Sequence, residues 1–254
     1  MNLPPVGLGT MGVADPSTVT TAIDLGYRHL DTAQIYENER TVGEGIAAAS
    51  TDRSELVVAT KLWTDRLAGE DVRQGTEESL DRLGLDAVDL LYVHRPRDGY
   101  EPSETLPALD AVRAAGLTDH VGLSNFEPEQ LTTARTHLDA PIAAHQVEFH
   151  PFFHRQELLD DAQTHGYPLV AYSPLAGGAV FDDPTISDIA DRHDTTPAAV
   201  SIAWVLAHDN VVTIPKASSE AHLRANREAA QLDLEPAEIE LIDAIDREEE
   251  LYPE

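Results

Sequence analysis

The segment LVVATKLWTDRLAGEDVRQGTEESLDRL, residues 56–83, contains one short apolar run followed by one longer amphipathic segment. The run is rich in β-branched residues, which favours a strand at Leu56–Lys61. The following mixture of charged and apolar side chains favours a helix at Asp71–Leu83, with Asp71 near its start as a cap. One strand followed by one helix is the repeating unit of an α/β protein.

The same alternation continues through the whole chain. Further strands are expected at Gly7–Thr10, His29–Thr32, Ala87–Val93, His120–Ser124, Ala143–Val147, Leu169–Tyr172 and Val211–Ile214. Further helices are expected at Ser17–Leu25, Glu39–Ala49, Glu104–Ala115, Pro128–Leu138, Gln156–His165, Thr185–Arg192, Pro197–Ala207, Ser219–Ala230 and Pro236–Arg247. Ser103 and Thr196 are expected to cap helices, and Gly26, Gly116 and Gly166 to follow helix ends in a left-handed conformation.

Eight strand–helix units within 254 residues predict a closed (β/α)8 barrel of parallel strands. No linker or repeat interrupts the series, so we expect one domain over residues 1–254. The alternative is an open, doubly wound sheet, which would need a glycine-rich phosphate turn opening its first helix.

The chain is strongly acidic, with 46 Asp and Glu against 17 Lys and Arg and a formal net charge of −29. The acidic residues are dispersed, so there is no basic stripe for nucleic acid and no attraction to an anionic membrane. Adaptation to molar salt, where charges are screened within about 3 Å, explains this composition better than an ordinary acidic surface does.

Cysteine is absent, which excludes disulfides and thiolate metal sites. The first ten residues do not have the basic and apolar regions of a secretory signal, and no apolar stretch approaches the ~20 residues that span a bilayer. We therefore expect a cytoplasmic protein. The histidines form no ligand cluster on one element, so we expect no metal.

A polar residue ends each expected strand, and in a barrel these ends surround the active site. The polar ends are Thr10, Asp31, Lys61, His94, Ser124-Asn125, Gln146, Tyr172-Ser173 and Lys216. Lys61 and Lys216 are the only lysines in the chain, and each closes an apolar run. Both are therefore expected in the pocket, where arginine could not replace a compact ammonium.

Asp31, Lys61 and His94 come from consecutive strand ends, and Tyr36 follows Asp31 in the next loop, so the four could together form a proton donor. A buried ammonium beside the Tyr36 oxygen would lower the pKa of that phenol, Asp31 would keep the lysine charged, and His94 could polarise a carbonyl. Taken singly, each residue has an ordinary structural explanation, such as a helix cap or a core side chain. Their joint placement favours chemistry.

Seven segments of this chain resemble the aldo-keto reductases in the order of that family. They are HLDTAQIYENE, VVATKLW, DLLYVHRP, VGLSNF, HQVEFHP, AYSPLAGG and TIPKASS, between residues 29 and 219. The resemblance implies Asp31, Tyr36, Lys61 and His94 as a catalytic tetrad in which Tyr36 donates the proton. It also implies a nicotinamide cofactor that is bound without a Rossmann domain.

By position, the resemblance implies that Ser124, Asn125 and Gln146 hold the nicotinamide carboxamide and that Tyr172 stacks on the ring. It further places Thr10, Met11, Asp31, Ser173, Pro174 and Leu175 around the ring and pyrophosphate. Lys216, Ser218, Ser219 and His222 would lie around the adenosine 2′-phosphate, and Asn226 would contact the adenine. The family usually has serine at Ala217 and arginine at His222. We expect NADPH as the cofactor. Because histidine cannot form a bidentate fork with phosphate, discrimination against NADH is weaker, and NADH is not excluded.

For the substrate, the resemblance implies contacts with Met11, Trp63, His94 and Arg95. Arg95 stands where the family commonly has tryptophan, and it could bind an anionic substrate or turn outward to pair with Asp98 or Glu101. The chain after Arg247 is short, which predicts an open cavity mouth.

The sequence thus predicts a salt-adapted reductase that converts an aldehyde or ketone to an alcohol with NAD(P)H. We expect a monomer, with an oligomer as the alternative. The alternatives are a nucleotide-binding, non-enzymatic subunit or redox sensor on the same barrel, and an unrelated barrel enzyme such as a phosphosugar isomerase.

Overall fold

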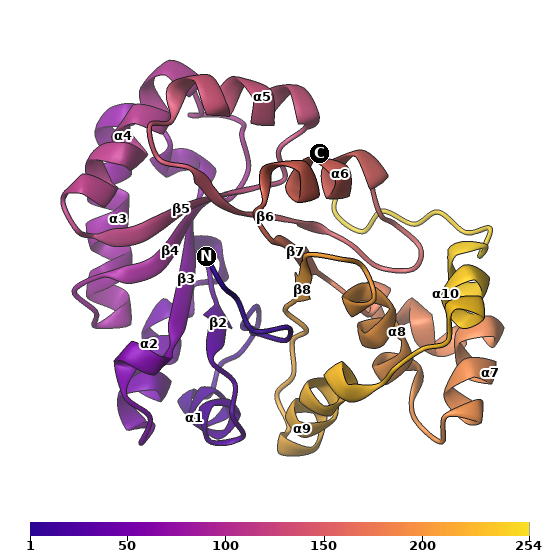
Figure 1. Cartoon of the computed structure of the whole chain (residues 1–254). Coiled ribbons are helices and arrows are strands. Elements are labelled where there is room, and N and C mark those ends of the chain that lie inside the picture. The colour runs from indigo at the N-terminus through magenta and orange to yellow at the C-terminus, as the bar shows by residue number, and fades with distance from the viewer. Residues whose placement is uncertain (254) are drawn as a thin grey trace.

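A computed structural model of the chain describes residues 1–253 and contains one sheet of eight strands that follow one another in chain order (Figure 1). Every neighbouring pair is parallel. Bridges from Val6 to Thr213 and from Gly9 to Lys216 close the sheet, so the predicted (β/α)8 barrel is confirmed. The strands are β1 Leu8–Gly9, β2 His29–Asp31, β3 Val57–Leu62, β4 Val88–Val93, β5 Thr118–Ser124, β6 Ile142–Glu148, β7 Leu169–Tyr172 and β8 Val211–Thr213.

Helices surround the barrel and bury their apolar faces against the outside of the sheet (Figure 1). They are α1 Pro16–Asp24, α2 Glu39–Ala48, α3 Gly69–Leu83, α4 Pro102–Ala114, α5 Pro128–His137, α6 Gln156–His165, α7 Pro184–Arg192, α8 Pro197–Leu206, α9 Glu220–Glu228 and α10 Pro236–Asp243. Three 3-10 segments, η1 Gln34–Tyr36, η3 Thr64–Arg66 and η4 Ala176–Asp182, lie in loops that follow the carboxyl ends of strands.

The helix ends test the capping predictions. Thr196 accepts a hydrogen bond from the Ala199 backbone as predicted. The caps at Asp71 and Ser103 are wrong because α3 and α4 begin earlier, at Gly69 and Pro102. Pro102 has the fixed φ that suits the first position of a helix, and Asp71 lies in the first turn of α3, where the helix dipole favours a carboxylate.

Gly26, Gly116 and Gly166 have φ values of 97°, 75° and 73°, so the prediction of left-handed helix ends is confirmed. The last helix is shorter than predicted. It ends at Asp243 instead of Arg247, and the backbone N–H of Glu249 donates to the carbonyl of Phe152. The chain therefore turns back towards the barrel after α10.

The open doubly wound sheet is excluded by the closure between the first and last strands. The segment GLGTMG, residues 7–12, does match the spacing G-x-G-x-x-G. It runs through β1 and the turn after it, however, and the first helix does not begin until Pro16. The glycines serve the barrel wall instead: a Cβ at Gly9 would lie 2.4 Å from the Ile214 carbonyl oxygen.

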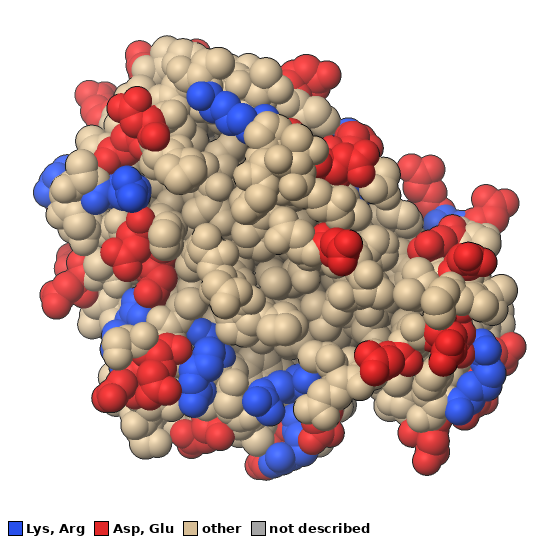
Figure 2. Space-filling model, in the orientation of Figure 1, with Lys and Arg blue, Asp and Glu red and all other residues tan. Residues whose placement is uncertain are grey.

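No helix within residues 1–253 combines the length and the apolar character needed to cross a bilayer. Acidic side chains are scattered around the face shown in Figure 2 and form no single patch there.

Candidate active site

The carboxyl ends of the strands surround a cavity of about 470 Å³. Fourteen of the predicted site residues line it: Thr10, Met11, Asp31, Tyr36, Trp63, His94, Arg95, Asn125, Gln146, Tyr172, Ser173, Pro174, Leu175 and Lys216. Lys61 and Ser124 are fully buried and do not line it. This is the expected result of parallel strands that all end at the same rim.

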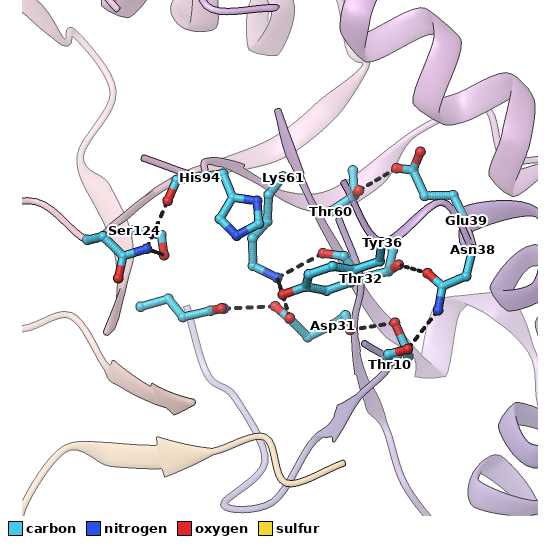
Figure 3. A network of polar contacts seen from close by, with 12 residues as sticks. Thr10, Asp31, Thr32, Tyr36, Asn38, Glu39, Thr60, Lys61, His94 and Ser124 are labelled. Atoms are coloured by element: carbon cyan, nitrogen blue, oxygen red, sulfur yellow. Dashed lines mark hydrogen bonds and ion pairs between the residues drawn. The ribbon is translucent and has the colours of Figure 1, made fainter. Parts of the chain in front are cut away.

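Lys61 lies at the centre of a buried group of polar atoms (Figure 3). Its ammonium forms an ion pair with Asp31 and donates to the Thr32 carbonyl at 2.9 Å and to the Tyr36 hydroxyl at 3.4 Å. Burial by itself lowers the pKa of Lys61, but Asp31 and Tyr36 together raise that pKa above its ordinary value. Lys61 therefore remains an ammonium ion next to the Tyr36 oxygen.

A network of hydrogen bonds fixes the strand ends that carry this group (Figure 3). The Thr10 hydroxyl donates to the Asp31 carbonyl at 2.9 Å, and the Asn38 amide donates to the Thr10 carbonyl at 2.6 Å. The Thr32 hydroxyl in turn donates to the Asn38 side-chain oxygen at 3.0 Å. Thr10 thus has a structural task at the end of β1 as well as a place on the cavity wall.

The Tyr36 phenol is less acidic than the sequence predicts. Lys61 does lower the pKa of Tyr36, but burial is the largest effect and raises that pKa, and Asp31 raises it further. The net pKa lies above the ordinary value of 10. The expectation that Lys61 makes Tyr36 acidic is therefore wrong as a net effect in this structure, because sequence reasoning weighed the charge and not the depth of burial.

His94 lies between two aromatic rings at the cavity wall. Its ring centroid is 5.8 Å from that of Tyr36 and 5.0 Å from that of Trp63, both in edge-on contacts. Burial, followed by the positive charges of Lys61, Arg95 and Arg97, lowers the pKa of His94 to about 2. The imidazole is therefore neutral in ordinary solution, so that one ring nitrogen carries a proton that it can donate.

Asn125 and Ser173 directly follow β5 and β7 in left-handed conformations, with φ values of 58° and 53°. Such conformations are costly for residues other than glycine and are concentrated at functional sites. The Asn125 amide donates to the His94 carbonyl at 3.0 Å and accepts from the Tyr172 hydroxyl at 2.9 Å. Asn125, His94 and Tyr172 are thus tied together across three strands.

Lys216 lies after β8 with an exposed side chain at the edge of the same cavity. The next helix, α9, begins nearby, and the Ser219 hydroxyl caps it by accepting from the His222 backbone at 3.2 Å. Ser218, Ser219 and His222 are exposed and Asn226 is buried, and none of the four lines the cavity. These four residues follow Lys216 along the chain and lie outside the cavity.

The aldo/keto reductase family model matches residues 5–247 of this chain. The chain belongs to the aldo/keto reductase family. It is therefore an oxidoreductase of a family that reduces carbonyls with nicotinamide cofactors.

Known relatives of this aldo/keto reductase match over nearly their full length. Methylglyoxal reductase DkgB of Escherichia coli O157:H7 is 36% identical over 97% of this chain and 94% of that protein. Glyoxal reductase of Bacillus subtilis strain 168 is 34% identical over 100% and 92%, respectively. A crystal structure of a putative 2,5-diketo-D-gluconic acid reductase B matches with a TM-score of 0.91 and 36% identity over 95% of this chain and 87% of that chain. No support appears for a non-enzymatic subunit or a phosphosugar isomerase.

Several residues that line the cavity of the reductase were not predicted. They are Gly9, Ile35, Gly177, Gly178, Phe181, Ile214, Pro215 and Tyr252. Ile35 and Phe181 are apolar side chains that remain largely exposed, at 45% and 52%. Their positions next to Tyr36 and the Ser173–Leu175 turn were a signal that could have identified them.

Residues near the end of the reductase chain form part of the cavity wall, since Tyr252 lines it. The backbone N–H groups of Leu251 and Tyr252 donate to the buried Glu148 carboxylate at 2.8 and 3.2 Å. The Tyr252 ring lies edge-on to Tyr172, with centroids 5.8 Å apart. Tyr252 reaches the cavity because residues 251 and 252 are hydrogen-bonded to the end of β6.

Proposed function

We propose that this reductase converts small aldehydes and ketones, dicarbonyls among them, to alcohols, with NADPH as the hydride source and Tyr36 as the proton donor. The observation that carries the proposal is the Tyr36 hydroxyl at 3.4 Å from the buried Lys61 ammonium, at the wall of the cavity. The relatives named as methylglyoxal and glyoxal reductases support dicarbonyls as substrates.

In this proposal the cofactor supplies a hydride to the carbonyl carbon, and the protein supplies the proton and the orientation. Tyr36 is protonated at neutral pH because its pKa is raised, so it can give its proton to the carbonyl oxygen. Lys61 then stabilises the phenolate that remains, and Asp31 keeps Lys61 charged. Neutral His94 can donate an N–H to the same carbonyl oxygen and so orient it.

The side chains present fit a nicotinamide nucleotide. Asn125 and Gln146 line the cavity and offer polar groups for a carboxamide, with the Ser124 hydroxyl buried behind them, where it accepts from the Asn125 amide at 3.1 Å. Tyr172 offers a ring face on the same cavity as Tyr36. Lys216 and the amino end of α9 offer positive charge and backbone N–H groups for a phosphate at the far end. Thr10, Met11, Ser173, Pro174 and Leu175 would border the ring and pyrophosphate between these ends.

Cofactor preference depends on the residues around the 2′-phosphate, where Lys216, Ser218, Ser219 and His222 are proposed contacts; Asn226 is a proposed contact of the adenine. The reductase is expected to oxidise NADPH with methylglyoxal at a higher kcat/KM than NADH. His222→Arg should raise the preference for NADPH by roughly threefold to tenfold, because arginine can form a two-bond fork with phosphate. Initial rates with both cofactors measure this. An unchanged ratio in H222R would show that His222 lies away from the phosphate.

Arg95 is nine-tenths buried and lines the cavity, which favours a substrate contact over an outward position. We expect Arg95→Leu to raise KM for an anionic carbonyl such as glyoxylate by roughly tenfold, since a charge-assisted hydrogen bond is lost. The KM for neutral methylglyoxal should change less than about twofold. Equal effects on the two substrates would contradict a carboxylate contact. The control Arg113→Leu removes an exposed charge on α4.

We further propose that the reductase is a single barrel domain, active as a monomer in the cytoplasm of a salt-adapted cell. The net charge of −29 supports salt adaptation, since the dispersed acids repel one another unless screened. The midpoint of thermal unfolding, followed by circular dichroism, should be lower by roughly 5–10 °C in ~0.1 M KCl than in molar KCl. This shift corresponds to a loss of about 2–3 kcal/mol in the free energy of unfolding. Equal midpoints in the two buffers would rule out salt adaptation.

A further inference from the structure

The turn that carries Tyr36 has to hold the phenol in place, because the phenol's contact with the ammonium is long. Tyr36 ends η1, and its hydroxyl lies 3.4 Å from the Lys61 ammonium (Figure 3). A typical N–H···O hydrogen bond measures roughly 2.7–3.2 Å. Lys61 itself is fixed by its ion pair with Asp31 and by its bond to the Thr32 carbonyl. The position of the phenol relative to this fixed charge therefore depends on what holds the turn.

One end of this turn is anchored to the end of β1. Asn38 follows η1, and its side-chain amide donates to the Thr10 carbonyl at 2.6 Å and to the Val13 carbonyl at 3.0 Å. Within the turn, Ile35 is 45% exposed at the cavity and does not bury it. The other end begins at Gln34, whose side chain reaches α3 and the end of β3.

The Gln34 amide is hydrogen-bonded through its oxygen and through its nitrogen. Its Oε1 accepts from the backbone N–H of Trp63, directly after β3, at 2.8 Å. Its Nε2 donates to the Gly75 carbonyl at 2.9 Å and to the Ser79 hydroxyl at 3.1 Å, both on α3. Because the two N–H groups and the carbonyl oxygen all have partners, the amide is held in one orientation. The side chain thus connects the turn to a strand end and to a helix.

The packing of α3 supports these bonds. A Cβ at Gly75 would lie 3.0 Å from the Arg66 Cβ and 3.2 Å from a Leu62 methyl carbon, so glycine lets this part of α3 lie close to the end of β3. Ser79 is fully buried, so water does not compete for its hydroxyl. The partners of the Gln34 amide are therefore themselves fixed.

The bond to Trp63 extends the effect to a second cavity residue. The Trp63 ring lies edge-on to His94, with centroids 5.0 Å apart, and the Tyr36 ring lies edge-on to the same imidazole at 5.8 Å. One amide thus fixes the backbone next to both aromatic rings that contact His94.

We propose that Gln34 is a positioning residue: its side-chain amide connects the turn that carries Tyr36 to the end of β3 and to α3, and so holds the Tyr36 hydroxyl at the Lys61 ammonium. This inference rests on the proposed role of Tyr36 as the proton donor. Without the amide, Asn38 still anchors one end of the turn, but the phenol can shift relative to the fixed ammonium. A displacement of about 1 Å at a reacting group can lower a rate by roughly 10²-fold.

Gln34→Met keeps the length of the side chain and removes all three hydrogen bonds. We expect kcat for methylglyoxal reduction to fall about tenfold in Q34M, because the proton donor is no longer held in place. The Kd for NADPH, measured by quenching of tryptophan fluorescence, should change less than about twofold, since the proposed cofactor contacts lie at the ends of other strands. A loss in kcat without a loss in cofactor affinity distinguishes positioning of Tyr36 from general damage to the barrel.

Two further variants sharpen the test. In a Tyr36→Phe background, Q34M should change kcat/KM less than about twofold, because no proton donor remains to be positioned. Gln34→Glu keeps an acceptor for the Trp63 N–H and loses the donors to α3, so kcat should fall by about twofold to fivefold. Q34E carries the same test, alone and in the Y36F background, if Q34M does not fold.

Gln163→Met is a matched control. The Gln163 amide also connects two segments, since it donates from α6 to the Asp209 carbonyl at 3.0 Å. Asp209 precedes β8, so this contact lies at the amino ends of the strands, away from the cavity. The kcat and the Kd for NADPH of Q163M should be those of the wild type.

Three results would overturn the inference, and they separate it from the proposed function. If Y36F loses carbonyl reduction while the folded Gln34 variants keep the wild-type kcat, only the role of Gln34 is wrong. If the Gln34 substitution has the same effect with and without the Tyr36 hydroxyl, Gln34 does not act through Tyr36. If Y36F keeps more than about a tenth of the wild-type kcat/KM, both the proposed role of Tyr36 and the inference fail.

Discussion

Replacing Tyr36 with phenylalanine is expected to lower kcat/KM for methylglyoxal reduction by about 10²–10⁴-fold, the usual contribution of a positioned general acid. The phenol belongs to a residue of the cavity wall, and its hydroxyl lies 3.4 Å from the buried Lys61 ammonium. Phenylalanine keeps the ring and its edge-on contact with His94 but removes the proton. The Kd for NADPH should change less than about threefold, since the proposed cofactor contacts are made by other residues.

Steady-state rates and NADPH titrations of Y36F, with Y100F as a control outside the cavity, test this expectation. A variant that retains more than about a tenth of the wild-type kcat/KM would remove Tyr36 from the proposed mechanism. A variant that no longer binds NADPH would instead give Tyr36 a role in cofactor binding.

Replacing Lys61 with methionine is expected to have the second largest effect, on both activity and stability. Methionine has a similar shape, but the substitution leaves the Asp31 carboxylate 1% exposed and without its counter-ion. Removing one partner of a buried ion pair commonly lowers stability by about 3–5 kcal/mol. Activity should fall by roughly 10²–10⁴-fold, because no positive charge is left to stabilise the Tyr36 phenolate.

The other lysine provides a sharp comparison. Lys216 is exposed, so Lys216→Met should leave the unfolding midpoint unchanged and should raise KM for NADPH without changing kcat at saturation. The double variant Asp31→Leu with Lys61→Met should recover part of the stability lost in K61M, since replacing a whole buried pair by apolar residues is often neutral. It should recover no activity. Full activity in K61M would contradict the role given to this ion pair.

Much of the fold could be predicted from the sequence because each strand and helix has a recognisable local pattern of apolar and polar residues. Runs such as 169–172 are β-branched or apolar and bounded by turns, and the barrel follows from counting such units. The grouping of Asp31, Lys61 and His94 was also predictable, since parallel strands end at one rim and each of these residues lies within one position of the end of a strand.

Other features depend on distances that no local pattern contains. The raised pKa of Tyr36 results from how deeply the loop after β2 buries the phenol, and charge alone suggested the opposite direction. The contact between the tail and Glu148 joins residues about a hundred positions apart, and residues 248–252 have no pattern that predicts it. The earlier start of α3 reflects its packing, because Gly69 lies against the backbone of Glu104 on α4.

The central claim, carbonyl reduction by hydride from the nicotinamide with a proton from Tyr36, is tested most directly by following the hydride. The reductase is incubated with methylglyoxal and NADPH that carries deuterium at the transferred position, and the alcohol is analysed by mass spectrometry. The account predicts one deuterium on the former carbonyl carbon with the wild-type enzyme and almost none with Y36F over the same time. An alcohol without deuterium, or equal labelling by the two enzymes, would contradict it.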